Sequence, residues 1–73
     1  MNQIEQSIIN YQDDLTGKIK KYDSLLTLSE FNMLNLLNRN LLLLDINKEV
    51  DRIGRVKLVA YDLERKIILN KII

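Results

Sequence analysis

Apolar residues recur with helical spacing through the first third of the chain. They follow one another at steps of three or four positions: Ile4, Ile8, Tyr11, Leu15, Ile19 and Tyr22. At about 100° per residue, these positions share one face of a helix, and polar residues occupy the other faces. The pattern therefore predicts a first helix over residues 3–22.

The next segment opens with a helix start signal. Thr27 and Glu30 have the spacing of a capping box, in which each side chain accepts a hydrogen bond from the backbone N–H of the other. Leu26 and Phe31 occupy the positions of a hydrophobic staple around this cap. We expect a second helix over 28–44, antiparallel to the first because the connection is short. Its apolar seam consists of Leu34, Leu37, Leu41 and Leu44.

A break is expected at 45–47, where Asp45 or Asn47 could cap a new helix, and one continuous helix to about residue 70 is the alternative. Beyond the break, apolar residues follow a seven-residue interval that is typical of coiled coils, with two more interleaved: Ile46, Ile53, Ala60 and Ile67, with Val56 and Leu63. The expected fold class is all-α, with two or three helices (about 3–22, 28–44 and 47–71) forming a helical hairpin.

The size of the chain favours self-association of this hairpin. A chain of 73 residues buries only roughly 60% of the surface that its unfolded form exposes. Small domains compensate with disulfides, metals or oligomerisation, and this chain has neither Cys nor His. We therefore expect a homodimer in which the seam residues form a bundle or coiled coil: Leu34, Leu37, Leu41, Leu44, Ile46, Ile53, Val56, Ala60 and Leu63.

The residue types that most enzymes use are scarce. With no His, no Cys and no Gly-rich phosphate loop, the chain lacks the usual general base, thiol nucleophile, zinc ligands and nucleotide cradle. Asp13 and Asp14 are adjacent, so on a helix they point about 100° apart and do not converge on one proton or metal. We expect no enzymatic activity, no catalytic residue, no metal and no cofactor.

The net charge of the chain and its distribution give little support for nucleic-acid binding. The net charge is +1, and the basic residues Lys48, Arg52 and Arg55 are interspersed with acids. The stretch LTLSEFNMLNLL resembles the first helix of the winged-helix domains of response regulators, but no recognition helix is expected after it. We expect no nucleic-acid partner, and a weak DNA-binding regulator is kept as an alternative. No segment has the length and hydropathy of a membrane span or a signal peptide, which predicts a cytoplasmic protein.

The last residues, ERKIILNKII, are unusually apolar for the end of a helix. One interpretation is that they fold back onto the chain's own bundle or onto a sister subunit. The other divides the chain into a helical dimerisation domain, 1–64, and a partner-docking segment, 65–73. In the second interpretation, a basic and aliphatic surface binds another protein through Arg65, Lys66, Ile67, Ile68, Lys71 and Ile72.

This ending, on a small helical chain rich in Asn, Lys and Ile, resembles the internal scaffolding proteins with which staphylococcal phage-satellite pathogenicity islands redirect capsid size. The matching residues are Arg65, Ile67, Ile68 and Lys71, and Lys66 intrudes between the Arg and the isoleucines. The resemblance implies a dimeric scaffold inside the procapsid that binds the major capsid protein of a phage through its C-terminal helix and directs assembly of small capsids. The alternative function is a small phage-type protein that inhibits a host replication or transcription factor.

Overall fold

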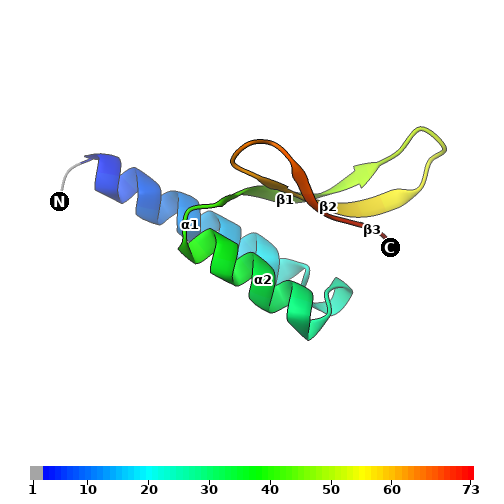
Figure 1. Cartoon of the computed structure of the whole chain (residues 1–73), viewed down its shortest axis with the longest axis horizontal. Helices are drawn as coiled ribbons and strands as arrows, with labels where there is room; N and C mark the ends of the chain where they lie inside the picture. The colour runs from blue at the N-terminus through cyan, green and yellow to red at the C-terminus, as the bar shows by residue number, and fades with distance from the viewer. Residues whose placement is uncertain (1–2) are drawn as a thin grey trace.

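The chain folds as two helices followed by a three-stranded sheet (Figure 1), and the computed structural model describes residues 3–73. The elements are α1 (Gln3–Lys21), a short 3-10 turn η1 (Asp23–Leu25), α2 (Leu28–Arg39), β1 (Leu43–Val50), β2 (Val56–Asp62) and β3 (Ile67–Ile72). The fold is therefore α+β, and the prediction of an all-α coiled coil is wrong: three antiparallel strands replace the third helix expected over 47–71.

The two helices form the antiparallel hairpin that the sequence predicts. α1 agrees with the expected helix to within one residue. α2 begins at Leu28, and its capping box is confirmed. The Glu30 N–H donates to Thr27 Oγ1 over 3.1 Å, and the Thr27 N–H donates to Glu30 Oε1 over 2.8 Å.

α2 ends at Arg39, earlier than the predicted boundary at 44, because the chain leaves the helix through a left-handed residue. Leu41 has a φ of 59°. The Leu42 N–H donates to the carbonyl of Leu37 and the Leu41 N–H donates to that of Asn38, the two hydrogen bonds of a Schellman motif. The apolar run 41–44 therefore leaves the helix and enters β1.

The sheet is an antiparallel meander with the order β1-β2-β3. A tight loop joins β1 to β2, and the Asp51 carboxylate accepts hydrogen bonds there from the N–H groups of Ile53 and Arg55. Gly54 has a φ of 82°, which the glycine adopts without the steric cost of a Cβ. The loop breaks the helix expected from the seven-residue spacing, and Ile53 lies at its tip.

Both helices lie on one side of the sheet (Figure 1), and the core fills the space between the two layers. The cross-strand partners Ile46 and Ala60 face the helices. The buried cluster comprises Leu15, Ile19 and Tyr22 from the first helix and its end, Leu34 from the second, and Leu43, Ile46, Leu58 and Ala60 from the sheet.

The residues expected at the seam are divided between core and surface. Leu34, Ile46 and Ala60 are fully buried, and Leu37 is half-buried against the core. Leu44 is half-buried at an irregularity in β1. The others are exposed in the single chain: Leu41, Ile53, Val56 and Leu63.

Candidate functional site

The two edges of the sheet differ in how they are covered. Along β1, the hydroxyl of Tyr11 donates to the backbone carbonyls of Leu43 and Leu44. Further on, the Lys18 Nζ lies 2.7 Å from Asp45 Oδ1, and it also donates to the Asn47 side chain. α1 is therefore fixed along the first half of β1 and occupies that edge.

The opposite edge is formed by β3, which pairs with β2 alone. In the part of the chain that the structure describes, no helix or further strand lies along the outer side of β3. Ile67 and Ile72 are 56% and 57% exposed. An edge strand with free backbone groups and exposed aliphatic side chains is a template for pairing with another chain.

The hydrogen-bonding ladder determines which backbone groups face this open side. The Ile73 N–H donates to the carbonyl of Val56 over 3.0 Å. In an antiparallel ladder, hydrogen-bonded and non-hydrogen-bonded pairs alternate. Ile72 and Asn70 pair with Lys57 and Val59, and by this alternation the N–H and C=O groups of Ile72 and Asn70 point away from β2. These groups form the hydrogen-bonding surface of the open edge.

Lys71 ties the open edge to the helical layer. Its Nζ lies 2.8 Å from Glu30 Oε1, and both side chains are about three-quarters buried. The hydrogen bond from Lys71, together with the backbone N–H of Thr27, lowers the pKa of Glu30. An inward-pointing lysine ordinarily discourages the pairing of an edge strand, but here a carboxylate neutralises its charge.

The other residues of the expected docking segment do not form one surface. Arg65 and Lys66 are exposed in the β2–β3 loop, where Lys66 pairs with Glu64 and Arg65 has a φ of 63°. Ile67 and Ile72 are exposed at the two ends of β3. Ile68 lies at an irregularity of the strand and packs against the core. Residues 65–73 thus comprise the end of a loop and strand β3, and the C-terminal helix expected there is wrong.

The face of the sheet that points away from the helices is partly polar. Tyr61 donates to Glu49 Oε2 over 2.6 Å, and this hydrogen bond raises the pKa of the Tyr61 hydroxyl. Val59 is buried beneath neighbouring side chains although no helix covers it. Ile67 and Ile72 therefore lie beside a face of the sheet on which Val59 is shielded from solvent.

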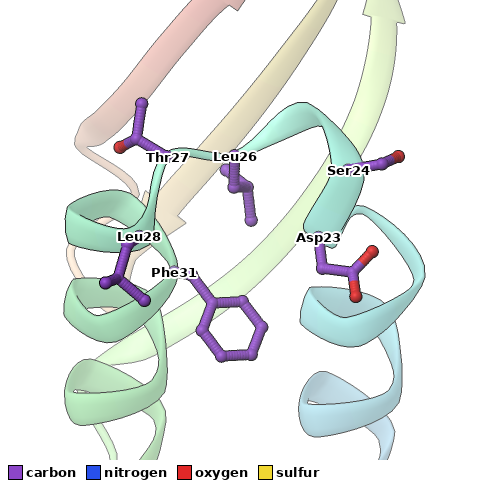
Figure 2. A pocket seen from close by; sticks show the side chains of 6 residues that line it. All are labelled: Asp23, Ser24, Leu26, Thr27, Leu28 and Phe31. Carbon is purple, nitrogen blue, oxygen red and sulfur yellow. The ribbon is translucent and has the colours of Figure 1, made fainter.

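A hollow lies at the corner between α1 and α2. Figure 2 shows the Phe31 ring pointing into the space between the two helices, with Leu26 above it and Leu28 in front of α2. Leu26 and Phe31 also pack against the core, as expected of the staple. The polar residues of this hollow are Asp23, Ser24 and Thr27, and the Thr27 hydroxyl already caps α2. The corner therefore serves to start the second helix.

The lining of this hollow includes no His and no Cys, and its one carboxylate is that of Asp23. Among residues 3–73, no group of three or more carboxylates, histidines or cysteines is placed to hold a metal ion. The expectation of a non-enzymatic protein stays a prediction. None of the helices in the described part combines the length and the apolar character needed to cross a membrane.

Comparison of the chain with protein-family models, with curated protein sequences and with solved structures found no match. The α+β fold and the geometry of its edges are therefore the basis of the functional proposal.

Two features of the site were missed by the sequence analysis. Asn70 contributes backbone groups to the open edge, and the sequence interpretation placed it within a helix. Tyr11 closes the other edge through its hydroxyl, whereas the pattern placed it only on the apolar seam. The valines and tyrosine of VKLVAYD and the Asp51–Gly54 spacing between two apolar runs were signals of a β-hairpin.

Proposed function

We propose that this chain is a non-enzymatic protein-binding module that recognises its partner by adding a strand to the open edge of β3. One observation carries the proposal: α1 covers the first half of the edge of β1, whereas the outer side of β3 has no such cover among the described residues. Strand addition takes its affinity from main-chain hydrogen bonds and its specificity from side chains on alternate positions.

The exposed isoleucines of β3 define what the added strand should look like. Ile67 and Ile72 lie near the two ends of β3 and are both more than half exposed. An incoming strand with aliphatic residues at matching alternate positions would cover them. Arg65 and Lys66, exposed in the preceding loop, would favour a carboxylate at the corresponding end of that strand.

The C-terminal residues suggest a phage capsid protein as the partner, and we propose this partner. The expected mode of contact changes. The contact would be made by an extended strand, not by a helix. Co-assembly of the chain with capsid protein, followed by counting small shells, tests this partner. Inhibition of a host replication or transcription factor through the same edge stays the alternative and predicts no effect on shell size.

The strand-addition mode can be tested with substitutions at Asn70. Asn70→Pro removes an N–H that points away from β2, so β2–β3 pairing should survive while an incoming strand loses a hydrogen bond and meets the proline ring. Asn70→Val keeps the N–H and should bind normally. The measurement is partner binding beside thermal unfolding for both variants. Equal binding by two folded variants would contradict strand addition.

A further inference from the structure

The sequence of the open edge reads nearly the same in both directions. The stretch IILNKII, residues 67–73, has Asn70 at its centre, two isoleucines at each end, and Leu69 and Lys71 between them. In an antiparallel pair of strands, a residue before the centre of one strand lies opposite a residue after the centre of the other. A second copy of β3, related by a two-fold axis at Asn70, would therefore place isoleucine opposite isoleucine.

The backbone of Asn70 fits the same axis. Its N–H and C=O groups point away from β2 and belong to the open edge. In a hydrogen-bonded antiparallel pair, two residues exchange both of these bonds, so Asn70 of one copy can pair with Asn70 of another. We propose that the open edge of β3 binds a second copy of the chain and joins the two sheets into one. This dimer rests on strand addition at β3, the proposed function, and occupies the edge until a partner strand displaces it.

The exposed isoleucines match across this axis on the outer face of the sheet. Ile67 pairs with Tyr61 and Ile72 pairs with Lys57, so both isoleucines point to the face that carries Tyr61 and Lys57. Ile68 is the extra residue of the irregularity in β3 and packs against the core. Because Ile68 is displaced in this way, Ile67 of one copy would lie beside Ile72 of the other. Each would cover a side chain that is more than half exposed in the single chain.

The charges on the helix side of the sheet favour the axis at Asn70. Lys71 would lie opposite Leu69 of the second copy, and the two Lys71 side chains would be diagonal neighbours about 7–8 Å apart. Glu30 neutralises Lys71 within each copy, with Nζ and Oε1 2.8 Å apart. An axis at Lys71 would instead place the two lysines directly opposite each other, where like charges are destabilising.

A two-fold pair closes the assembly at two copies, because each copy uses the same edge. The alternative pairs β3 with β1 of the next copy. Tyr11 and Lys18 already cover the first half of β1, so that pairing would be restricted to the second half. It would also leave a free edge at each end for further addition. We therefore expect a dimer and no larger species.

The dimer would control access to the partner site. A strand pair of six residues buries less than the roughly 800 Å² per partner of a standard interface, so we expect a dissociation constant between about 1 µM and 1 mM. A partner strand and a second copy need the same backbone groups of Asn70, and each therefore excludes the other. The apparent affinity for the partner should fall as the concentration of the chain rises above this constant.

Sedimentation equilibrium with charge variants at position 70 tests the axis. The wild-type chain should shift from 8.6 kDa to twice that mass as its concentration rises. Asn70→Asp keeps the N–H but places two carboxylates opposite each other, so its dissociation constant should rise about fivefold. Asn70→Lys should have the same effect, and an equimolar mixture of the two variants should dimerise as the wild type does. A wild-type chain that stays monomeric at millimolar concentration would overturn the proposal.

Asn10 provides the matched control. It is an exposed asparagine on α1, which lies along the other edge of the sheet. Asn10→Asp and Asn10→Lys should dimerise as the wild type does, alone and mixed. Equal weakening by the Asn10 variants, or a mixture of Asn70 variants that does not recover, would place the interface elsewhere. Growth of the wild-type chain beyond the dimer would also overturn the two-fold pairing.

Cross-linking provides a positive test, since the chain has no cysteine of its own. Hydrogen-bonded residues that face each other in an antiparallel pair have Cα atoms about 5.5 Å apart, which lies within the range of a disulfide. Asn70→Cys should therefore form a disulfide-linked dimer under mild oxidation. Asn10→Cys should not, and equal cross-linking of the two variants would contradict the proposed pairing.

The linked dimer also separates this inference from the proposed function. Oxidised Asn70→Cys should lose binding of the phage capsid protein, and reduction should restore it. If the chain stays monomeric while Asn70→Pro still abolishes capsid-protein binding, the dimer is wrong and strand addition stands. If the linked dimer binds capsid protein as well as the reduced chain does, the dimer stands and the partner does not bind at β3.

Discussion

Lys71 and Glu30 join the last strand of the sheet to the first turn of α2 through a contact of 2.8 Å between Nζ and Oε1. Glu30 also accepts the Thr27 N–H of the capping box. One carboxylate therefore stabilises the start of α2 and holds the edge strand against the helical layer. The coupling of these two roles can be measured.

A double-mutant cycle with Lys71→Met and Glu30→Gln should give a favourable coupling free energy between the two side chains. The pair is partly solvated, which limits its contribution. Glu30→Gln keeps an acceptor for the Thr27 N–H, so the cap should largely persist. Urea unfolding of the four chains gives the coupling. A value of zero would mean that solvent screens the pair fully.

Acid should destabilise the fold. The pKa of Glu30 is lowered from 4.5, and hydrogen bonds from Arg55 lower that of Asp51 from 3.8. Burial raises the pKa of Asp45, but hydrogen bonds from Lys18 and the Ile46 N–H outweigh it, so this pKa is also lowered. A lowered pKa stabilises the folded state above the ordinary value and loses this effect as pH falls through the folded value. Unfolding free energy should therefore decrease from about pH 4.5 downward.

Asp45→Asn is the variant for this pH dependence. It removes the charge that Lys18 neutralises, so the unfolding free energy of the variant should vary less steeply with pH below 4.5 than that of the wild type. Chemical denaturation across the acid range provides the comparison. Parallel profiles would show that Asp45 does not take part in acid destabilisation.

At position 41, a glycine substitution should give a more stable protein than an alanine substitution, which is the reverse of the usual order. Both Leu41→Ala and Leu41→Gly remove the apolar side chain, but only glycine adopts a φ of 59° without a steric cost. We expect the glycine variant to be more stable than the alanine variant by about 1 kcal/mol. Thermal unfolding of the two variants measures this effect. A more stable alanine variant would show that the left-handed turn relaxes.

Asn38 is the one polar residue in the core of the described chain. Its Nδ2 donates to the carbonyl of Gln12 and to Thr16 Oγ1, linking the two helices. Asn38→Ala should lower the unfolding free energy by about 0.5–1.5 kcal/mol, because the part-buried hydrogen bonds to the Gln12 carbonyl and Thr16 Oγ1 are lost. Asn35→Ala, whose amide bonds only within α2, is the matched control and should cost less.

Local signals in the first half of the chain predicted its structure well. The apolar spacing that ends at Tyr22 defined α1, and the Thr27–Glu30 pair defined the start of α2. Each signal depends on residues within a few positions of one another. The left-handed Leu41, which ends α2, has no such signal, because glycine or asparagine is the usual residue there.

The second half was predicted wrongly because two periodicities overlap in it. Ile46 and Ala60 are 14 positions apart and share a face of the sheet, so a heptad template also fits them. Gly54 lies within the range expected for the third helix, but its N–H donates to the Asp51 carbonyl and the two residues form a turn. The open edge of β3 could not be predicted, because it depends on where α1 lies in three dimensions.

The succession of a helical hairpin and a meander also has a consequence for the speed of folding. Each strand pairs with its neighbour in the sequence, and the two helices are consecutive as well. Chains dominated by such local pairings close their loops at little entropic cost, and mixed domains of this kind fold more slowly than helical bundles but faster than all-β domains. Each half can therefore form its own turn before the layers meet, and the slow, long-range step is confined to docking of the sheet onto the helices.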